Sequence, residues 1–315
     1  MPPFDIEGGL GFAFVRGISV AACLSVLGAL VFRLVVAPPV LAGMKPSAAA
    51  EQDRRWLRLL WGSVAAALLG AGGWLGLESG AMAGATGIAD RLAAVPLVVL
   101  NSRFGMVLVI RLGLLAAVPL AIGRSLRPPR LAIAAALAAA AAASQASLGH
   151  AASIGHGFEW LALSTTLHIL AAAIWLGQLP PLWIFLADAP PAAAGLALRR
   201  FSRLGLTCVI LLAATASAQG WGLVGGVAGF VGTAYGWTAL AKLLLFGILL
   251  AIAAINRFTF MPRLASGVAA TARRALCRSV LVEAILGLLV ILAAGILTSL
   301  PPGMDAAQGL RWPYR

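Results

Sequence analysis

Histidine and cysteine are both scarce in this chain of 315 residues, which contains three of each. The cysteines, Cys23, Cys208 and Cys277, are far apart and form no CxxC pair, so the sequence predicts neither a disulfide framework nor a thiolate metal site. All three histidines lie in one stretch, residues 148–183 (LGHAASIGHGFEWLALSTTLHILAAAIWLGQLPPLW). Any metal chemistry should therefore pass through this stretch.

Charged residues are also few, at 10% of the chain, whereas about a quarter of a soluble globular domain is charged. Hydrophobic residues make up 61%, which predicts an integral membrane protein. The net charge of +13 would suggest a nucleic-acid partner in a soluble protein. Because the cytoplasmic loops of membrane proteins collect Lys and Arg, we expect the lipid bilayer as partner and no nucleic acid.

Catalytic motifs are missing as well. The chain has no phosphate-binding loop, no nucleophile triad pattern and no HExxH motif, so nothing supports hydrolytic catalysis and we do not expect an enzyme. The first residues are acidic and lack a basic region before the first apolar run, which is not the pattern of a cleaved signal peptide.

Eight apolar runs are long enough to span a bilayer, which takes about 20 residues as a helix. The sequence thus predicts an all-α, polytopic membrane helix bundle, and we treat 1–315 as a single integral membrane domain. The runs cover residues 13–37, 57–77, 104–122, 131–149, 160–186, 204–224, 237–256 and 280–299.

The basic residues predict the orientation. Most of them fall in or beside the connections that follow the first, third, fifth and seventh runs. By the positive-inside rule these connections are cytoplasmic and both termini face outward, into the periplasm of a Gram-negative host. All three histidines then belong to the outer half of the bundle.

His168 and Trp175 are seven residues apart, so they share one face of a helix. An ionisable group inside a membrane is costly, and it usually faces a cavity or the bundle interior. His168 is therefore either a metal or haem ligand or a neutral imidazole bonded to a neighbouring helix. His150, His156 and Glu159 form a set that suits Cu(II), Zn or Ni, or else the two histidines are solvated loop residues.

Two cationic residues, Arg111 and Lys242, lie within runs near their outer ends. We expect them to extend to the outer surface; the alternatives are that they balance Glu78, Asp90 or Glu159, or that they suit the propionates of a haem or a liganded carboxylate. Glu283 lies near the inner end of the last run, where Arg257 or Arg278 is its expected partner.

Several segments, taken in order, resemble the CopD family of copper-resistance membrane proteins. RFGMVLVIRLGLL resembles the G-x(5)-R segment of the family, LHILAAAIWLGQL its H-x(6)-W-x-G helix, and RRFSRLGL the start of its next helix. TAYGWTALAKLLLFGILLAIAAINRFTFMPRL resembles its Y-G-x(5)-K…N-R…P segment, and RRALCRSVLVEAILGLLVILAAGILTSLPP its closing helix. The family-pattern positions are Gly105, Arg111, His168, Trp175, Gly177, Tyr235, Gly236, Lys242, Asn256, Arg257, Pro262 and Glu283.

The resemblance is strongest over 148–302, looser before that range and absent from the first hundred residues. It implies an inner-membrane protein of eight helices that handles copper, usually by uptake toward the cytoplasm, alongside a periplasmic copper-binding protein of the CopC type. Trp175, Tyr235, Lys242, Arg111, Asn256 and Glu283 are then expected along the pathway or around the ligands.

The leading hypothesis is therefore copper transport or homeostasis, in which His150, His156 and Glu159 receive copper at the outer face and pass it to His168. The alternative is a haem b electron-transfer protein with His150 and His168 as axial ligands. A scaffold or sensor without transport is a third possibility.

Overall fold

The structure, a computed structural model, describes residues 9–123, 126–148, 159–264 and 269–304, and all regular secondary structure in these residues is helical. Eight segments within these ranges are long and apolar enough to cross a membrane, which confirms the predicted all-α membrane bundle. They are Gly9–Ala42, Pro46–Met82, Arg103–Ile122, Pro128–Leu148, Glu159–Asp188, Pro191–Val224, Ala234–Arg263 and Ala269–Leu297.

Four spans are continuous helices: α3 (Pro46–Met82), α5 (Arg103–Ile122), α9 (Pro191–Val224) and α13 (Ala269–Leu297). The first comprises α1 (Gly9–Val31), the π-helix η1 (Phe32–Val36) and α2 (Ala37–Ala42). The fourth comprises α6 (Pro128–Ala143) and the 3₁₀ turn η2 (Ser144–Leu148), and the fifth comprises α7 (Glu159–Leu176) and α8 (Leu179–Asp188). The seventh comprises α11 (Ala234–Ile255), the π-helix η4 (Asn256–Phe260) and α12 (Met261–Arg263).

Prolines account for three of these interruptions. Pro38, Pro180 and Pro262 are each the second residue of the helix that follows η1, the α7–α8 break or η4. A proline inside a helix removes one backbone hydrogen bond and its ring clashes with the preceding turn, so the helix must kink or widen there.

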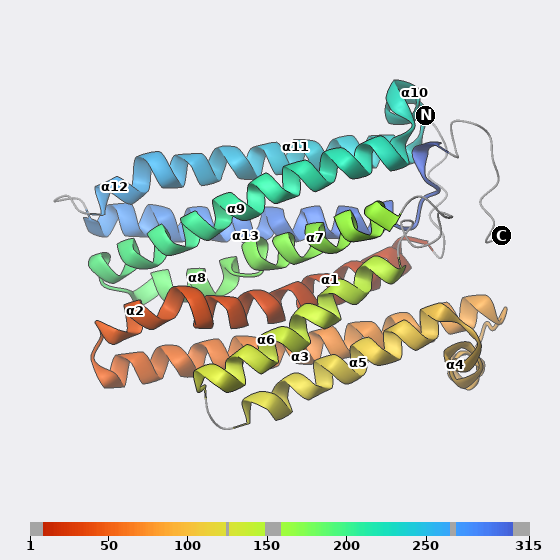
Figure 1. The fold of residues 1–315 in the computed structure, drawn as a ribbon, viewed down its shortest axis with the longest axis horizontal. Helices are drawn as coiled ribbons and strands as arrows, with labels where there is room; N and C mark the ends of the chain where they lie inside the picture. The colour runs from red at the N-terminus through yellow and green to blue at the C-terminus, as the bar shows by residue number, and fades with distance from the viewer. Residues whose placement is uncertain (1–8, 124–125, 149–158, 265–268, 305–315) are drawn as a thin grey trace.

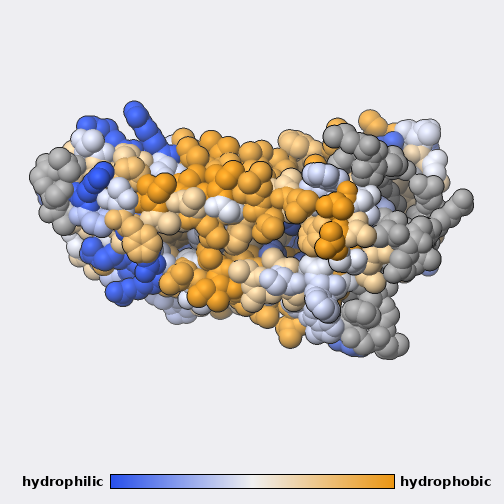
Figure 2. Space-filling model, turned by 90° about the horizontal axis from the view of Figure 1, so that it is seen from above, coloured by the Kyte–Doolittle hydropathy of each residue, from blue (hydrophilic) through white to orange (hydrophobic). Residues whose placement is uncertain are grey.

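The long helices lie side by side, and the bundle has two distinct ends (Figure 1). We call them the α10 end, where the short helices α4 (Ile88–Asn101) and α10 (Gly226–Gly232) lie, and the α12 end, where α2 and α12 lie. The helix ends that flank the four basic connections gather at the α12 end. Figure 2 shows hydrophilic side chains at that end and a hydrophobic belt along the middle of the molecule.

Two of the basic segments that we expected as connections are helical. α3 starts at Pro46 and α9 at Pro191, so both begin about three turns before the expected runs. Within this extension of α3, Arg55 pairs with Glu51 one turn away, at 3.2 Å, and with Asp188 of α8. These charges lie beyond the apolar part of each helix, which is why hydropathy alone did not include them.

The first and fifth spans form the centre of the bundle. α1 packs against α3, α6, α7 and α13, and α7 also packs against α9. α1 and α7 meet at Gly28 and Gly177, so closely that a Cβ on Gly28 would lie 2.0 Å from the carbonyl carbon of Gly177. Small residues at such crossings let membrane helices approach backbone to backbone.

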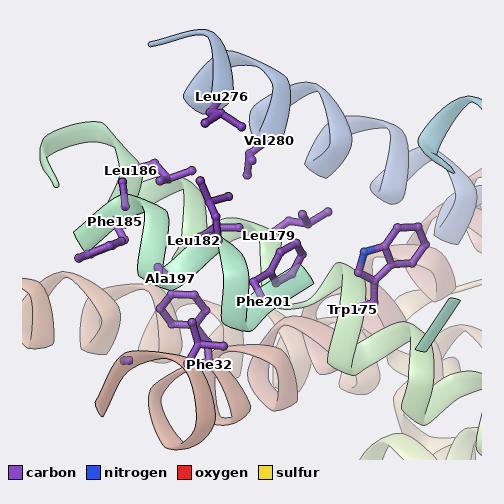
Figure 3. Close-up of a cluster of buried hydrophobic side chains, with 14 of the residues drawn as sticks. Phe32, Trp175, Leu179, Leu182, Phe185, Leu186, Ala197, Phe201, Leu276 and Val280 are labelled. Atoms are coloured by element: carbon purple, nitrogen blue, oxygen red, sulfur yellow. The ribbon is translucent and has the colours of Figure 1, made fainter. Parts of the chain in front are cut away.

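The largest buried cluster fills the half of the bundle nearer the α12 end. Side chains of η1, α7, α8, α9 and α13 converge there, as Figure 3 shows for Phe32, Trp175, Phe185, Phe201 and Val280. This cluster holds the α7–α8 break in place and fixes Trp175 within the interior.

Candidate functional site

His168 lies on α7, in the half of the bundle nearer the α10 end, and faces α9. Its Nδ1 is 2.9 Å from Oγ1 of Thr215. That hydroxyl oxygen is in turn 2.7 Å from the carbonyl oxygen of Leu211. A carbonyl only accepts, so when the Thr215 hydroxyl donates to Leu211, its Oγ1 accepts from His168 Nδ1–H, in the tautomer that carries the proton on Nδ1. Nε2 is therefore the ring nitrogen that carries a lone pair, which is the form of imidazole that binds metal ions.

The surroundings of His168 join three spans. One turn earlier on α7, the hydroxyl of Ser164 donates to the backbone oxygen of Thr215 at 3.3 Å, which adds a second tie between α7 and α9. Lys242 of α11 lies within electrostatic range of the half-buried imidazole. A cation that binds at Nε2 would therefore meet a neighbouring positive charge.

Among the described residues, the predicted ligand Glu159 is not grouped with His168. His150 and His156 lie outside the described residues, but the positions that flank this stretch, Leu148 and Glu159, are at the α10 end. Glu159 is exposed at the start of α7, roughly 13 Å along the helix axis from His168 at 1.5 Å per residue. In the part of the chain that the structure describes, no group of three or more His, Cys, Asp or Glu residues is placed to hold a metal ion.

Trp175 follows His168 two turns later on α7, as the seven-residue spacing predicts. Its indole is buried and meets the ring of Phe246 on α11 edge to face, with 6.1 Å between ring centroids. On the other side it lies against Gly205 of α9, where a Cβ would come within 3.2 Å of the indole. Trp175 thus lies in the interior between α9 and α11, two helical turns after His168.

Tyr235 is buried at the start of α11, at the α10 end, in a cluster with Leu161 of α7 and Leu300. It therefore belongs to the packing that closes the bundle beyond His168.

Arg111 belongs to a separate cluster in the first half of the chain. Only 2% of its surface is exposed, and its Nε donates to the Ser144 hydroxyl at 3.0 Å. The guanidinium lies 5.8 Å from the ring centroid of Trp74, which Arg16 also contacts at 5.0 Å. The expectation that Arg111 extends to the surface is wrong, because Ser144 and Trp74 provide partners inside the bundle.

Arg111 and Lys242 nevertheless have matching positions in their helices. α5 and α11 begin with the N-caps Ser102 and Thr233, and each hydroxyl accepts a backbone N–H three residues later at 3.0 Å. Arg111 and Lys242 are both nine residues after their caps. The two halves of the chain therefore each place one cation at the same depth from the α10 end.

Asn256 and Glu283 form a buried pair on the far side of Trp175. The Asn256 amide donates to Oε1 of Glu283, and the two residues are 8% and 2% exposed. Arg257 instead donates from Nη1 to Oγ of Ser202 at 2.9 Å. The expected pairing of Glu283 with Arg257 or Arg278 is wrong within the described residues, because Glu283 faces the bundle interior while Arg257 faces α9.

Sequence reasoning missed Thr215, Ser202 and Trp74, the partners of His168, Arg257 and Arg111. Hydroxyls are common in membrane helices, where they bond to their own backbone, and tryptophans are common as packing residues. Spacing along one helix could not show which of them a neighbouring helix would use.

An all-helical bundle with eight helices long and apolar enough to cross a membrane, counted over the described residues, defines the class of polytopic membrane proteins. Within this class, the chain belongs to the CopD family. Residues 195–297 match the family model of Copper resistance protein D, and residues 6–159 match that of the Copper resistance protein D-like, N-terminal domain. The protein is thus a multi-pass copper-resistance membrane protein, and the inner membrane is consistent with the family.

The match over 6–159 shows that the expected absence of resemblance in the first hundred residues is wrong. His168 and Trp175 lie between the two matched ranges. Thr215, Lys242 and Glu283 lie within residues 195–297, the range that matches Copper resistance protein D. The family supports copper, and it gives no support to the haem alternative. No curated protein and no solved structure matches the chain.

Proposed function

We propose that this protein carries copper ions across the inner membrane, from the periplasm toward the cytoplasm, and that His168 binds the ion on the way. The observation that carries the proposal is the bond from His168 to Thr215, which leaves Nε2 available for a metal ion inside a membrane bundle of the CopD family. The role is transport, and no catalytic step is assigned to the chain.

The proposed orientation places the α12 end in the cytoplasm. It is supported by the basic residues of that end, because cytoplasmic segments of membrane proteins are enriched in Lys and Arg. The start of α1 and the end of α13 are then on the periplasmic side.

Copper would reach His168 from the stretch that contains His150 and His156. The residues that flank this stretch are at the α10 end, and Glu159 is exposed there as a carboxylate ligand. Imidazole and carboxylate together suit Cu(II). A separate periplasmic protein of the CopC type would be a suitable donor, because it could present copper to this face.

Transport also requires release. An ion held by few ligands and no thiolates leaves more readily than one in a closed cage. An imidazole beside the positive charge of Lys242 meets this requirement, since the charge opposes a bound cation. This arrangement favours a transient site over a storage site.

The test compares His168→Ala with Leu167→Ala, a neighbouring residue that is 36% exposed on the same helix. Copper bound per chain is measured by titration of purified protein, and uptake is measured in vesicles that contain a copper-sensitive dye. His168→Ala should bind one copper fewer than Leu167→Ala and should lower uptake to the level of protein-free vesicles. If His168→Ala retains both the copper and the uptake, the proposed site is wrong.

A further inference from the structure

A cavity of about 280 Å³ lies beyond Trp175, in the half of the bundle nearer the α12 end. Its walls come from α9, from α11 with η4 and α12, and from α13. Trp175 faces it from α7, and Asn256, Glu283 and Met261 line it. The cavity is therefore linked to His168 through Trp175, which lies two turns after it on α7.

The buried pair in this cavity is incomplete in two respects. A carboxylate at membrane depth is costly without a counter-charge, and within the described residues Glu283 has one amide donor and no ion pair. Oδ1 of Asn256 is a buried acceptor with no hydrogen-bond partner in the same part of the chain. Two oxygen acceptors that lack positive partners are what a bound cation would complete.

Backbone geometry brings these acceptors to the cavity. Asn256 is the first residue of η4, and a π-helical turn inserts an extra residue into the helix, so the side chains that follow are rotated relative to a regular α-helix. π-helical turns are frequent at functional sites. Here the turn coincides with Asn256, Arg257 and Phe258, all of which line the cavity.

Among the residues that the structure describes, Arg257 is the one cationic side chain in the cavity wall. Its Nη1 bonds to Ser202 on α9, and its guanidinium carbon lies 5.8 Å from the ring centroid of Phe258. These contacts hold the guanidinium on the α9 side, whereas Glu283 projects from α13. The carboxylate is therefore left without this charge and is available to an ion in the cavity.

We propose that Glu283 and Asn256 form a second copper site, which takes the ion after it leaves His168. This inference rests on the proposed transport function. The carboxylate oxygen of Glu283 and the amide oxygen of Asn256 would bind Cu(II), and the thioether of Met261 on the same cavity wall is a ligand that Cu(I) prefers. This site would bind the ion on the cytoplasmic side of His168, where the histidine stretch provides no ligand.

The test compares Glu283→Gln with Val280→Ala, a change in the wall of the same cavity that removes no oxygen. Copper per chain is measured by titration, uptake in dye-loaded vesicles, and folding by the thermal unfolding midpoint. Glu283→Gln should bind one copper fewer than Val280→Ala, and its uptake should fall at least tenfold. Should Glu283→Gln fail to fold, Asn256→Leu, which removes the unpaired oxygen, should show the same loss.

The double variant of His168 and Glu283 separates this inference from the proposed function. If both hold, each single variant loses one copper and the double variant loses two. If only Glu283→Gln loses copper, the site at His168 is wrong and the second site remains. If both Glu283→Gln and Asn256→Leu bind as much copper as the unaltered protein, the second site is wrong. If, in that case, uptake no longer responds to a pH gradient, Glu283 is assigned to proton transfer. If Glu283→Gln binds one copper fewer but its uptake is unchanged, the second site binds copper and is not on the transport route.

Discussion

Nδ1 of His168 donates to the hydroxyl of Thr215 across 2.9 Å, and a backbone carbonyl determines the direction of this bond. When that hydroxyl donates to Leu211 O, its oxygen accepts from the imidazole N–H. Thr215 lies within residues 195–297, which match the family model, and it orients His168, which lies outside both matched ranges. The consequence is a fixed tautomer, with Nε2 available for a metal ion.

Replacing Thr215 with valine should weaken copper binding by about 10–100-fold, the usual effect of removing the group that orients a metal-binding histidine. Valine has nearly the same shape and cannot accept the Nδ1–H. Copper titration of the purified variant measures the loss. Thr215→Ser should retain most of the affinity, and Thr166→Val, which removes a hydroxyl bonded only to its own helix, should have no effect. Equal affinities for Thr215→Val and Thr166→Val would contradict the orienting role.

Lys242→Met should bind copper more tightly than the unaltered protein, by up to about tenfold, or ~1.4 kcal/mol. The reason is that methionine removes the positive charge that opposes a cation at His168. Lys242→Arg keeps the charge and serves as the control. The comparison is made by equilibrium titration at two salt concentrations. Weaker copper binding in Lys242→Met would show that Lys242 acts on the site in another way.

Arg111→Met should lower the free energy of unfolding by about 2 kcal/mol or more, because it removes a charged hydrogen bond to Ser144 and the contact with Trp74. Copper affinity should stay within about twofold, since these contacts are on α3 and η2 and none reaches His168. Unfolding in mixed detergent micelles and copper titration measure the two effects. A large loss of affinity in a variant that remains folded would place Arg111 on the copper route.

Gly28→Ala should destabilise the bundle by at least about 2 kcal/mol, because the added Cβ would lie 2.0 Å from the backbone of Gly177. Gly113→Ala is the matched control, since a Cβ there meets nothing within 4 Å. Alanine is the better helix former by ~1 kcal/mol, so Gly113→Ala should be neutral or stabilising. Thermal unfolding in detergent tests both, and equal midpoints would contradict the close crossing of α1 and α7.

The sequence by itself determined the number of membrane spans. Twenty apolar residues that follow one another along the chain can satisfy their backbone only as a helix within a bilayer, so local composition is sufficient. The same holds for Trp175, whose place two turns from His168 follows from helix periodicity alone. The basic helix extensions of α3 and α9 were missed because charge conceals a helix from a hydropathy pattern.

Only the tertiary structure decided which side chains meet across helices. It paired His168 with Thr215 and Glu283 with Asn256, and it placed Arg111 inside the bundle beside Trp74. The partners in each pair are far apart in the sequence. Packing of helices from distant parts of the chain brings them together. The physical reason is that periodicity gives the face of a helix on which a residue lies, whereas the neighbour of that face depends on the close approach at Gly28 and Gly177 and on the π-helical turns.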